Sequence, residues 1–191
     1  MISIKLGIIF PIINCLLILT INAQNIDSQK ATKALSFLLG RWGIERIYSP
    51  ESDNPVVVQG TLECQYGLSD QFIRCVYDME RSGKTNTFDV AYFNYNEIYN
   101  TYESLWLSTT WPIKVLLRGN LDKVSDALIL DTKAFFMIQD SITEFVNDKL
   151  VWKVESADSF NRKTYVRTSQ DCPDHWKYHM LEKARFKKGG K

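Results

Sequence analysis

The sequence contains two histidines, His175 and His179. At this spacing on a helix, two imidazoles could hold a zinc ion. The alternation around them favours a strand instead, where residues four apart lie on one face but about 13 Å from each other. They also fall on the outward-facing set together with Lys177. We therefore expect no shared metal site, although one histidine as an axial haem ligand stays open.

Motifs for nucleophilic catalysis are absent from the chain. It has no Gly-x-Ser-x-Gly elbow and no phosphate-binding loop. Cys172 and His175 are close in sequence, but no third group is evident that would orient the histidine. Chance proximity is the favoured interpretation. The sequence thus predicts no catalytic residue and no cofactor.

Three charged residues stand among apolar alternates of strand-like segments, namely Arg46, Glu103 and Glu182. If these faces point inward, the fold contains buried charges, which must be paired. A few polar groups in an aromatic interior are typical of a ligand site. The alternative is that these residues lie at the mouth of the fold, in contact with water.

The elements that would position these residues begin with a helix. Asp27-Ser28 suits an N-cap, and Gly40 suits a left-handed C-terminal position. The apolar residues between them have helical spacing, and they are Ala31, Ala34, Leu35 and Leu38. We expect one amphipathic helix of about three turns.

After Gly40 the hydrophobic period becomes two, which is typical of strands. Trp42, Ile44, Arg46 and Tyr48 fall on one face. About nine or ten short strands follow with turn signals between them. Asn147-Asp148 is predicted to be a tight turn, Asn161-Arg162 to lead into a strand, and 127–138 to form one bent strand or two. The fold class is therefore all-β, an antiparallel up-and-down barrel with the N-terminal helix closing one end.

The aromatic content is high, with 13% Phe, Trp and Tyr. An eight-stranded barrel is just wide enough for its own side chains, whereas a ten-stranded barrel leaves room for a ligand. We therefore expect the interior to bind a small hydrophobic molecule, at the end away from the helix. The predicted wall residues are Arg46, Tyr66, Tyr77, Trp106, Trp152 and Tyr178. The alternatives are acid–base catalysis by an interior Arg/Glu/Tyr cluster, a haem-binding barrel and a protein-interaction module.

The first 23 residues have the layout of a secretory signal peptide. Lys5 is followed by an apolar segment over 6–21, and Ala23 precedes a polar restart. We expect cleavage near Ala23, a secreted or periplasmic protein, and one domain over 24–191. An uncleaved N-terminal anchor is the alternative, although the apolar runs are short for a membrane span. The remaining 22 basic and 22 acidic residues balance, which gives no attraction to nucleic acid.

Export permits a disulfide bond. Cys64 and Cys75 lie in two strand-like segments around a turn at Ser69-Asp70. If the turn centres there, residues 64 and 75 are directly opposite each other, close enough for a bridge. Two small buried thiols are the alternative. Cys172 would be a leftover thiol.

Several motifs together resemble those of a known family. They are Phe37-Leu38-Leu39-Gly40-Arg41-Trp42, Gly60-Thr61-Leu62-Glu63-Cys64, Asp89-Val90-Ala91-Tyr92-Phe93-Asn94 and the strand Tyr102 to Ser108. The chain resembles the lipocalin-like side of the calycin barrels and, more closely, the DUF1579 family. The calycin resemblance implies that Trp42 packs under an arginine from a late strand, for which Arg167 is the candidate and Arg185 the alternative. Related nitrobindin barrels bind haem, but this chain has Gly43-Ile44-Glu45 where they carry Gly-Glu-Gly.

Overall fold

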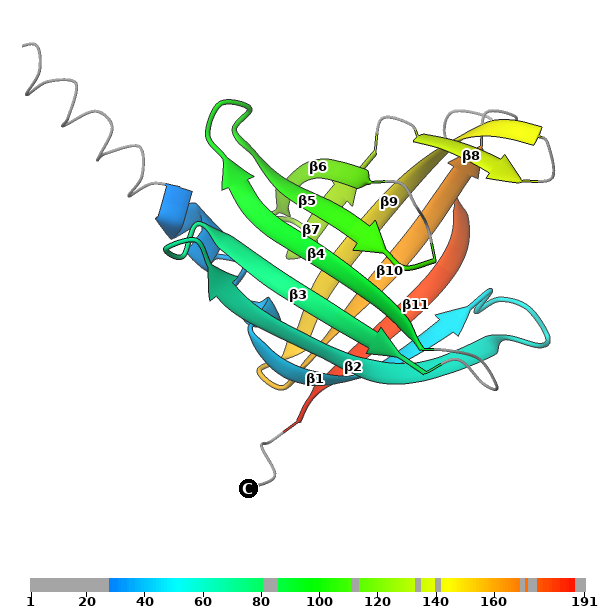
Figure 1. Ribbon diagram of the computed structural model, residues 1–191, viewed down its shortest axis with the longest axis horizontal. Helices are drawn as coiled ribbons and strands as arrows, with labels where there is room; N and C mark the ends of the chain where they lie inside the picture. Colours follow the sequence, from blue (N-terminus) through cyan, green and yellow to red (C-terminus); the bar gives the residue numbers. More distant parts are fainter. Residues whose placement is uncertain are drawn as a thin grey trace, which may run out of the picture.

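The computed structural model describes residues 28–80, 86–110, 114–132, 135–139, 142–168, 171 and 175–187, with the backbone alone for 135–139 and 142–145. The predicted signal peptide lies outside these residues. Eleven strands occupy the described part of the chain (Figure 1). Their bounds are β1 Gly40–Tyr48, β2 Val56–Gly67, β3 Phe72–Met79, β4 Thr87–Asn96, β5 Thr101–Ser108, β6 Val115–Asp122, β7 Ala127–Asp131, β8 Phe135–Gln139, β9 Ile142–Ser156, β10 Ser159–Thr168 and β11 Lys177–Phe186.

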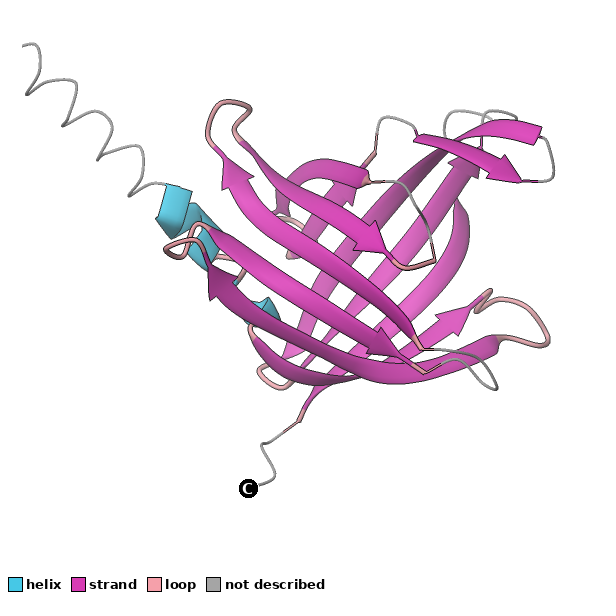
Figure 2. Cartoon of the chain, viewed as in Figure 1, coloured by secondary structure: helices cyan, strands magenta, loops and turns pink. Residues whose placement is uncertain are grey.

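Ten of these strands form a closed antiparallel barrel, as Figure 2 shows. Consecutive strands pair from β1 to β7, β7 pairs with β9, and β9 to β11 pair in turn. The pairing of β11 with β1 closes the ring, with Trp42 opposite Phe186 and Tyr48 opposite Met180. The predicted fold class is therefore confirmed.

The segment from residue 127 to 156 agrees with the prediction in its first part and differs from it in its second. The apolar stretch 127–138 forms two strands, β7 and β8, and both pair with the long strand β9. The predicted turn at Asn147-Asp148 is wrong, because these residues lie inside β9, opposite Arg167 and Val166 of β10. Pairing to strands on both sides outweighs the local turn preference of Asn and Asp. The chain instead reverses at residues 157–158.

The helical segment closes one end of the barrel. Residues 28–33 are helical, and a 3₁₀ turn over Ser36–Leu38 follows, so the predicted helix is divided in two. Leu35 and Leu38 are fully buried in the core. Gly40 has a φ of +112° and opens β1, and a Cβ there would lie 2.5 Å from the Phe186 ring. Only glycine fits this conformation and this close contact without strain.

Trp42 joins this closed end to the last strands. Its indole nitrogen donates a hydrogen bond to the carbonyl of Leu38 at 2.8 Å. Its ring meets Phe160 and Phe186 edge to face, with centroids 4.9 and 5.1 Å away. Trp42 belongs to the main cluster of buried apolar and aromatic residues, together with Leu35, Leu38 and Phe160.

The predicted contact of Arg167 with Trp42 is wrong. The guanidinium of Arg167 lies over the ring of Trp176, 4.7 Å from its centroid. Arg167 is seven residues along β10 from Phe160, the neighbour of Trp42, and seven residues of strand span about 23 Å. The alternative partner, Arg185, is exposed opposite Gly43. Among the described residues, aromatic rings therefore pack against Trp42 in place of the predicted cation.

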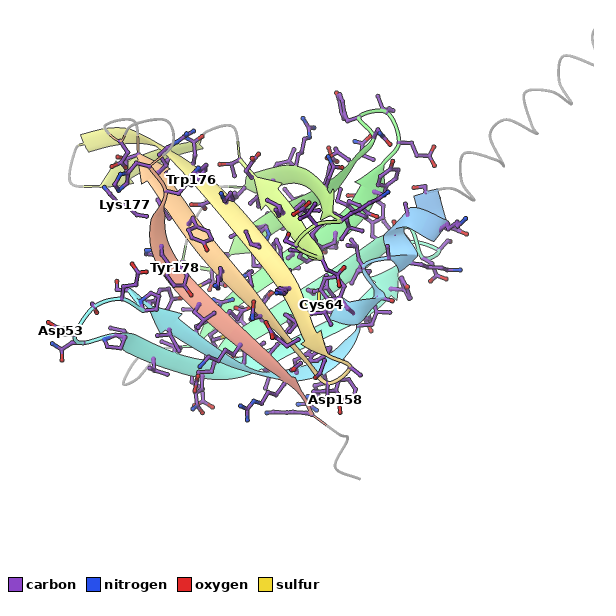
Figure 3. All side chains as sticks on the ribbon, turned by 180° about the vertical axis from the view of Figure 1, so that it is seen from behind. Asp53, Cys64, Asp158, Trp176, Lys177 and Tyr178 are labelled. Carbon is purple, nitrogen blue, oxygen red and sulfur yellow. A yellow bond between two sulfur atoms is a disulfide. The ribbon has the colours of Figure 1, made fainter. Side chains whose placement is uncertain are left out.

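The predicted disulfide bond between Cys64 and Cys75 is present. The two residues are direct partners of β2 and β3, and their Cα atoms are 4.1 Å apart. Both are buried, and Figure 3 shows Cys64 toward the helical end of the barrel.

None of the helices among the described residues has the length and apolar character needed to cross a membrane.

Candidate functional site

A cavity of about 240 Å³ lies inside the barrel, at the end away from the helix. Its walls come from the last residues of β1 and β5, the first residues of β4, β6 and β11, and the middle of β9 and β10. The lining residues are Arg46, Tyr48, Asp89, Trp106, Ser108, Thr110, Val115, Leu117, Asp148, Leu150, Arg162, Thr164 and Met180. Their mixture of aromatic, aliphatic and charged groups is that of a small-molecule site.

Three buried charged residues lie at the floor of this cavity, where Arg46 and Arg162 line it and Glu182 pairs with both of them. Arg46, Arg162 and Glu182 are 5%, 3% and 0% exposed. Glu182 is the direct cross-strand partner of Arg46 on β1 and of Arg162 on β10. Its Oε2 accepts a hydrogen bond from Arg46 Nε at 2.6 Å and another from Arg162 Nη2 at 2.8 Å. Strand register alone thus brings the three side chains together and pairs the charges, as burial requires.

A second carboxylate balances this arginine pair. Asp89, on β4, accepts a hydrogen bond from Arg46 Nη1 at 3.2 Å. Burial alone would lower the pKa of Arg46, but the neighbouring Glu182, Tyr48, Tyr77 and Asp89 outweigh it and raise the pKa. Arg46 therefore stays a cation.

Aromatic rings enclose the two guanidinium groups. The Arg46 group lies 4.8 Å from the centroid of the Tyr77 ring. The Arg162 group lies 4.8, 5.5 and 5.7 Å from the rings of Trp106, Tyr77 and Trp152. Cation–π attraction stabilises such contacts. Burial and the adjacent Glu182 raise the pKa of Tyr77, so its phenol stays protonated.

Several donors in this cluster are closed off from the cavity space. Arg46 Nη2, Arg162 Nε, Trp106 Nε1 and Thr164 Oγ1 are fully buried, and none has a hydrogen-bond partner among the described residues. The aromatic rings around the guanidinium groups account for this shielding of the arginines. Five of the six nitrogen atoms of the two guanidinium groups are thus either bonded to Glu182 or Asp89 or fully buried.

Asp148 is the charged group of the cavity that remains open. It lies in the middle of β9, half-buried, and no described residue donates a hydrogen bond to its carboxylate. Burial raises its pKa to about 6, an effect that Arg162 partly opposes. An acid that titrates near neutral pH inside a pocket is a candidate functional group.

Of the six residues predicted to form the cavity wall, two line the cavity and four lie elsewhere. Arg46 and Trp106 line the cavity. Tyr77 and Trp152 are buried against the arginine pair. Tyr66 packs against the core from the end of β2. Tyr178, labelled in Figure 3, stacks on Tyr165 with centroids 5.3 Å apart and does not line the cavity.

Asp89, Asp148 and Arg162 were not predicted as site residues. Arg162 could have been found from the alternation of Phe160, Arg162 and Thr164, all of which are buried. The turn-like composition around Arg162 and Asp148 concealed both. No sequence signal singles out Asp89.

The carboxylates proposed for acid–base catalysis do not form a catalytic pair. Glu103 lies on the outer face of β5, where it accepts a hydrogen bond from Arg118 at 2.6 Å. Glu182 points into the barrel, as the catalytic alternative required. Both arginines, however, donate hydrogen bonds to its Oε2. Of the two carboxylates, only Glu182 thus points inward, because the two side chains lie on opposite faces of the wall.

Neither histidine contributes to the cavity. His179 is exposed on β11, where its ring meets that of Tyr48 at 6.0 Å, and His175 is exposed just before that strand. The residues that line the cavity therefore do not fit haem held by an axial histidine. Over the described ranges, no three His, Cys, Asp or Glu residues gather as a metal site would require.

The barrel is similar to solved structures of low sequence identity. Rv2717c from M. tuberculosis is 11% identical with a TM-score of 0.57, over 83% of this chain and 98% of that one. A de novo designed fluorescence-activating β-barrel is 12% identical with a TM-score of 0.41, over 80% and 95% of the two chains. A redesigned barrel, mFAP0, bound to DFHBI, is 8% identical with a TM-score of 0.41, over 78% and 98%.

These similarities concern the fold. No curated protein matches the chain. The family model described as "Protein of unknown function (DUF1579)" matches residues 27–181. The match spans nearly the whole described barrel, and the chain belongs to the DUF1579 family.

Proposed function

We propose that this protein binds a small, largely apolar molecule non-covalently inside the barrel, at the end away from the helix. The observation that carries the proposal is the 240 Å³ cavity, which aliphatic, aromatic and charged residues line together. Typical ligand pockets measure about 300–1,000 Å³, so the ligand is smaller than a drug-sized molecule. A cavity of roughly 150 Å³ in an apolar core is known to hold benzene.

The proposed contacts divide between apolar walls and the polar floor. Val115, Leu117, Leu150 and Met180 would cover the body of the ligand, with Trp106 beside them. Arg46 and Arg162 would act through Glu182, by holding the floor of the cavity rigid. Preorganised pockets of this kind bind without first reorganising their side chains.

Filling the cavity tests this proposal. Val115 lines the cavity near the start of β6, and the adjacent Leu116 is exposed on the outer face. Val115→Trp should therefore abolish binding, whereas the matched control Leu116→Trp should retain it. Native mass spectrometry of protein purified from its own host would detect a co-purifying molecule, and a thermal-shift screen of small apolar compounds would supply one otherwise. Binding that survives Val115→Trp would place the ligand elsewhere and refute the proposal.

We also propose that the protein is exported, with cleavage near Ala23 and one domain over residues 24–191. The buried disulfide supports this, since such bonds persist in oxidising compartments. N-terminal sequencing of protein recovered from the host tests the proposal. A mature chain that starts at Gln24 is expected, and a chain that retains Met1 would contradict it.

A further inference from the structure

We propose that the ligand is a small organic monocation, an amine with an apolar body whose ammonium group pairs with Asp148. This inference rests on the proposed function, because it names the ligand class of the same cavity. It follows from the count of charges around the cavity, from which of them a ligand can reach, and from the shape of the remaining wall.

The charges at the cavity do not cancel. Arg46 on β1 and Arg162 on β10 are cations, while Asp89 on β4, Asp148 on β9 and Glu182 on β11 are acids. With all five ionised, two positive and three negative charges leave a net charge of −1. A monocation would bring the site to neutrality, whereas an anion would bring it to −2 in a partly desolvated interior, which is costly.

The accessible atoms favour the same ligand. The arginine donors that lack partners among the described residues are fully buried. Glu182 gives its Oε2 to both arginines, and Asp89 binds Arg46. The Asp148 carboxylate accepts no hydrogen bond from the described residues and faces the cavity. A ligand thus meets an unpaired carboxylate at Asp148, whereas five of the six guanidinium nitrogen atoms are bonded to a carboxylate or buried.

The rest of the wall suits a compact hydrocarbon body. Val115, Leu117, Leu150 and Met180 are apolar. The neutral hydroxyls of Ser108 and Thr110 bind each other at 2.9 Å. The cavity lining includes no charged side chain from β5, β6 or β7. Among the described residues, none on this side would therefore repel or compete for an ammonium group.

Protonation of Asp148 should switch this affinity. Its pKa is raised to about 6 by burial, while an alkylamine resembles lysine, with a pKa of about 10.4, and stays charged throughout. The titratable and charged groups that line the cavity with Asp148 are Arg162 from β10, Arg46 and Tyr48 from β1 and Asp89 from β4, and Glu182 pairs with both arginines. Of these, Arg162 acts on the pKa of Asp148. Amine binding should therefore weaken as the pH falls through 6.

Three matched probes test the charge preference: 2-phenylethylamine as the cation, 2-phenylethanol as the neutral analogue and phenylacetate as the anion. Their dissociation constants would be measured by calorimetry and ligand-observed NMR on the mature chain at pH 7.5 and pH 5. The variants are Asp148→Asn and, as a control, Asp131→Asn, which removes an exposed acid at the end of the neighbouring β7.

At pH 7.5 we expect the amine to bind about tenfold tighter than the alcohol, as a partly buried ion pair allows. Asp148→Asn and pH 5 should each remove this preference, so that the amine binds no tighter than the alcohol, and Asp131→Asn should keep it. Equal affinity for amine and alcohol, or tighter binding of phenylacetate, would overturn the monocation while leaving a binding cavity. If none of the three probes binds, and Val115→Trp does not weaken binding of the molecule that co-purifies or emerges from the screen, both proposals fail. If Asp148→Asn does not fold, the affinities of the three probes for the wild-type protein at pH 7.5 and pH 5 still test the charge preference.

Discussion

The Asp148 carboxylate costs the folded protein free energy at neutral pH. Burial raises its pKa from 3.8 to about 6, so the folded state holds this proton more tightly than the unfolded state does. Its contribution to stability is therefore fully present below about pH 4 and is lost as the pH rises through about 6. This direction is the reverse of that for an acid paired in an ion bridge.

Replacing Asp148 by Asn should remove this penalty. We expect Asp148→Asn to raise the free energy of unfolding at pH 8 by on the order of 1–2 kcal/mol, after allowance for partial exposure, and to change it little at pH 4. Urea denaturation of both proteins at the two pH values measures the difference, with Asp131→Asn as a surface control. A stabilisation of equal size at both pH values would contradict the titration as its cause.

Individual residues of the site were predictable where alternation is unbroken. Arg46 stands between Ile44 and Tyr48, and the pattern correctly predicts its inward direction. Asp148 follows Asn147, and this pair has the composition of a turn. Pairing of β9 with its neighbours on both sides determines its conformation instead, and such long-range contacts are invisible in local preferences.

At the level of elements, Glu182 links three consecutive strands of the ring, β10, β11 and β1. Loss of its charge would leave Arg162 without its carboxylate partner in the interior, while Arg46 would keep Asp89. Uncompensated buried charges are far more costly than exposed ones.

Glu182→Gln should therefore lower the free energy of unfolding by about 3 kcal/mol or more. Glu103→Gln is the matched control, since Glu103 pairs with Arg118 on the exposed outer face, where ion pairs contribute about 1 kcal/mol at most. Chemical denaturation of both variants supplies the comparison. If Arg162→Met combined with Glu182→Met restores much of the lost stability, the cost belongs to the unpaired charge. Equal losses in the two single variants would refute the special role of Glu182.

Element types were more predictable than element boundaries. The period of two and the turn signals correctly predict an antiparallel meander, and the turn at Ser69-Asp70 aligns Cys64 with Cys75. The Arg167 prediction failed because strand length, which sets how far a side chain lies from the closed end, depends on where each turn falls. The chain turns at residues 157–158, and β10 begins at Ser159. The strand therefore starts before the Asn161-Arg162 pair that was predicted to lead into it.

At the level of the whole molecule, the barrel depends on one closure between distant parts of the sequence. β11 pairs with β1 on one side and β10 on the other, and the backbone of Lys187 donates to the carbonyl of Arg41 at the end of this seam. β11 also carries Glu182 and Met180 into the cavity region. The same strand thus completes both the fold and the site.

Truncation after Trp176 should therefore abolish the folded monomer. It would leave β1 and β10 with unpaired edges, which template intermolecular pairing, and would remove the partner of both buried arginines. We expect oligomers or insoluble protein by size-exclusion chromatography and light scattering. A truncation after Lys187 is the control, because it keeps every described strand, and it should remain monomeric to the same extent as the full mature chain. If the chain truncated after Trp176 is a soluble monomer with native near-ultraviolet circular dichroism, closure by β11 is dispensable.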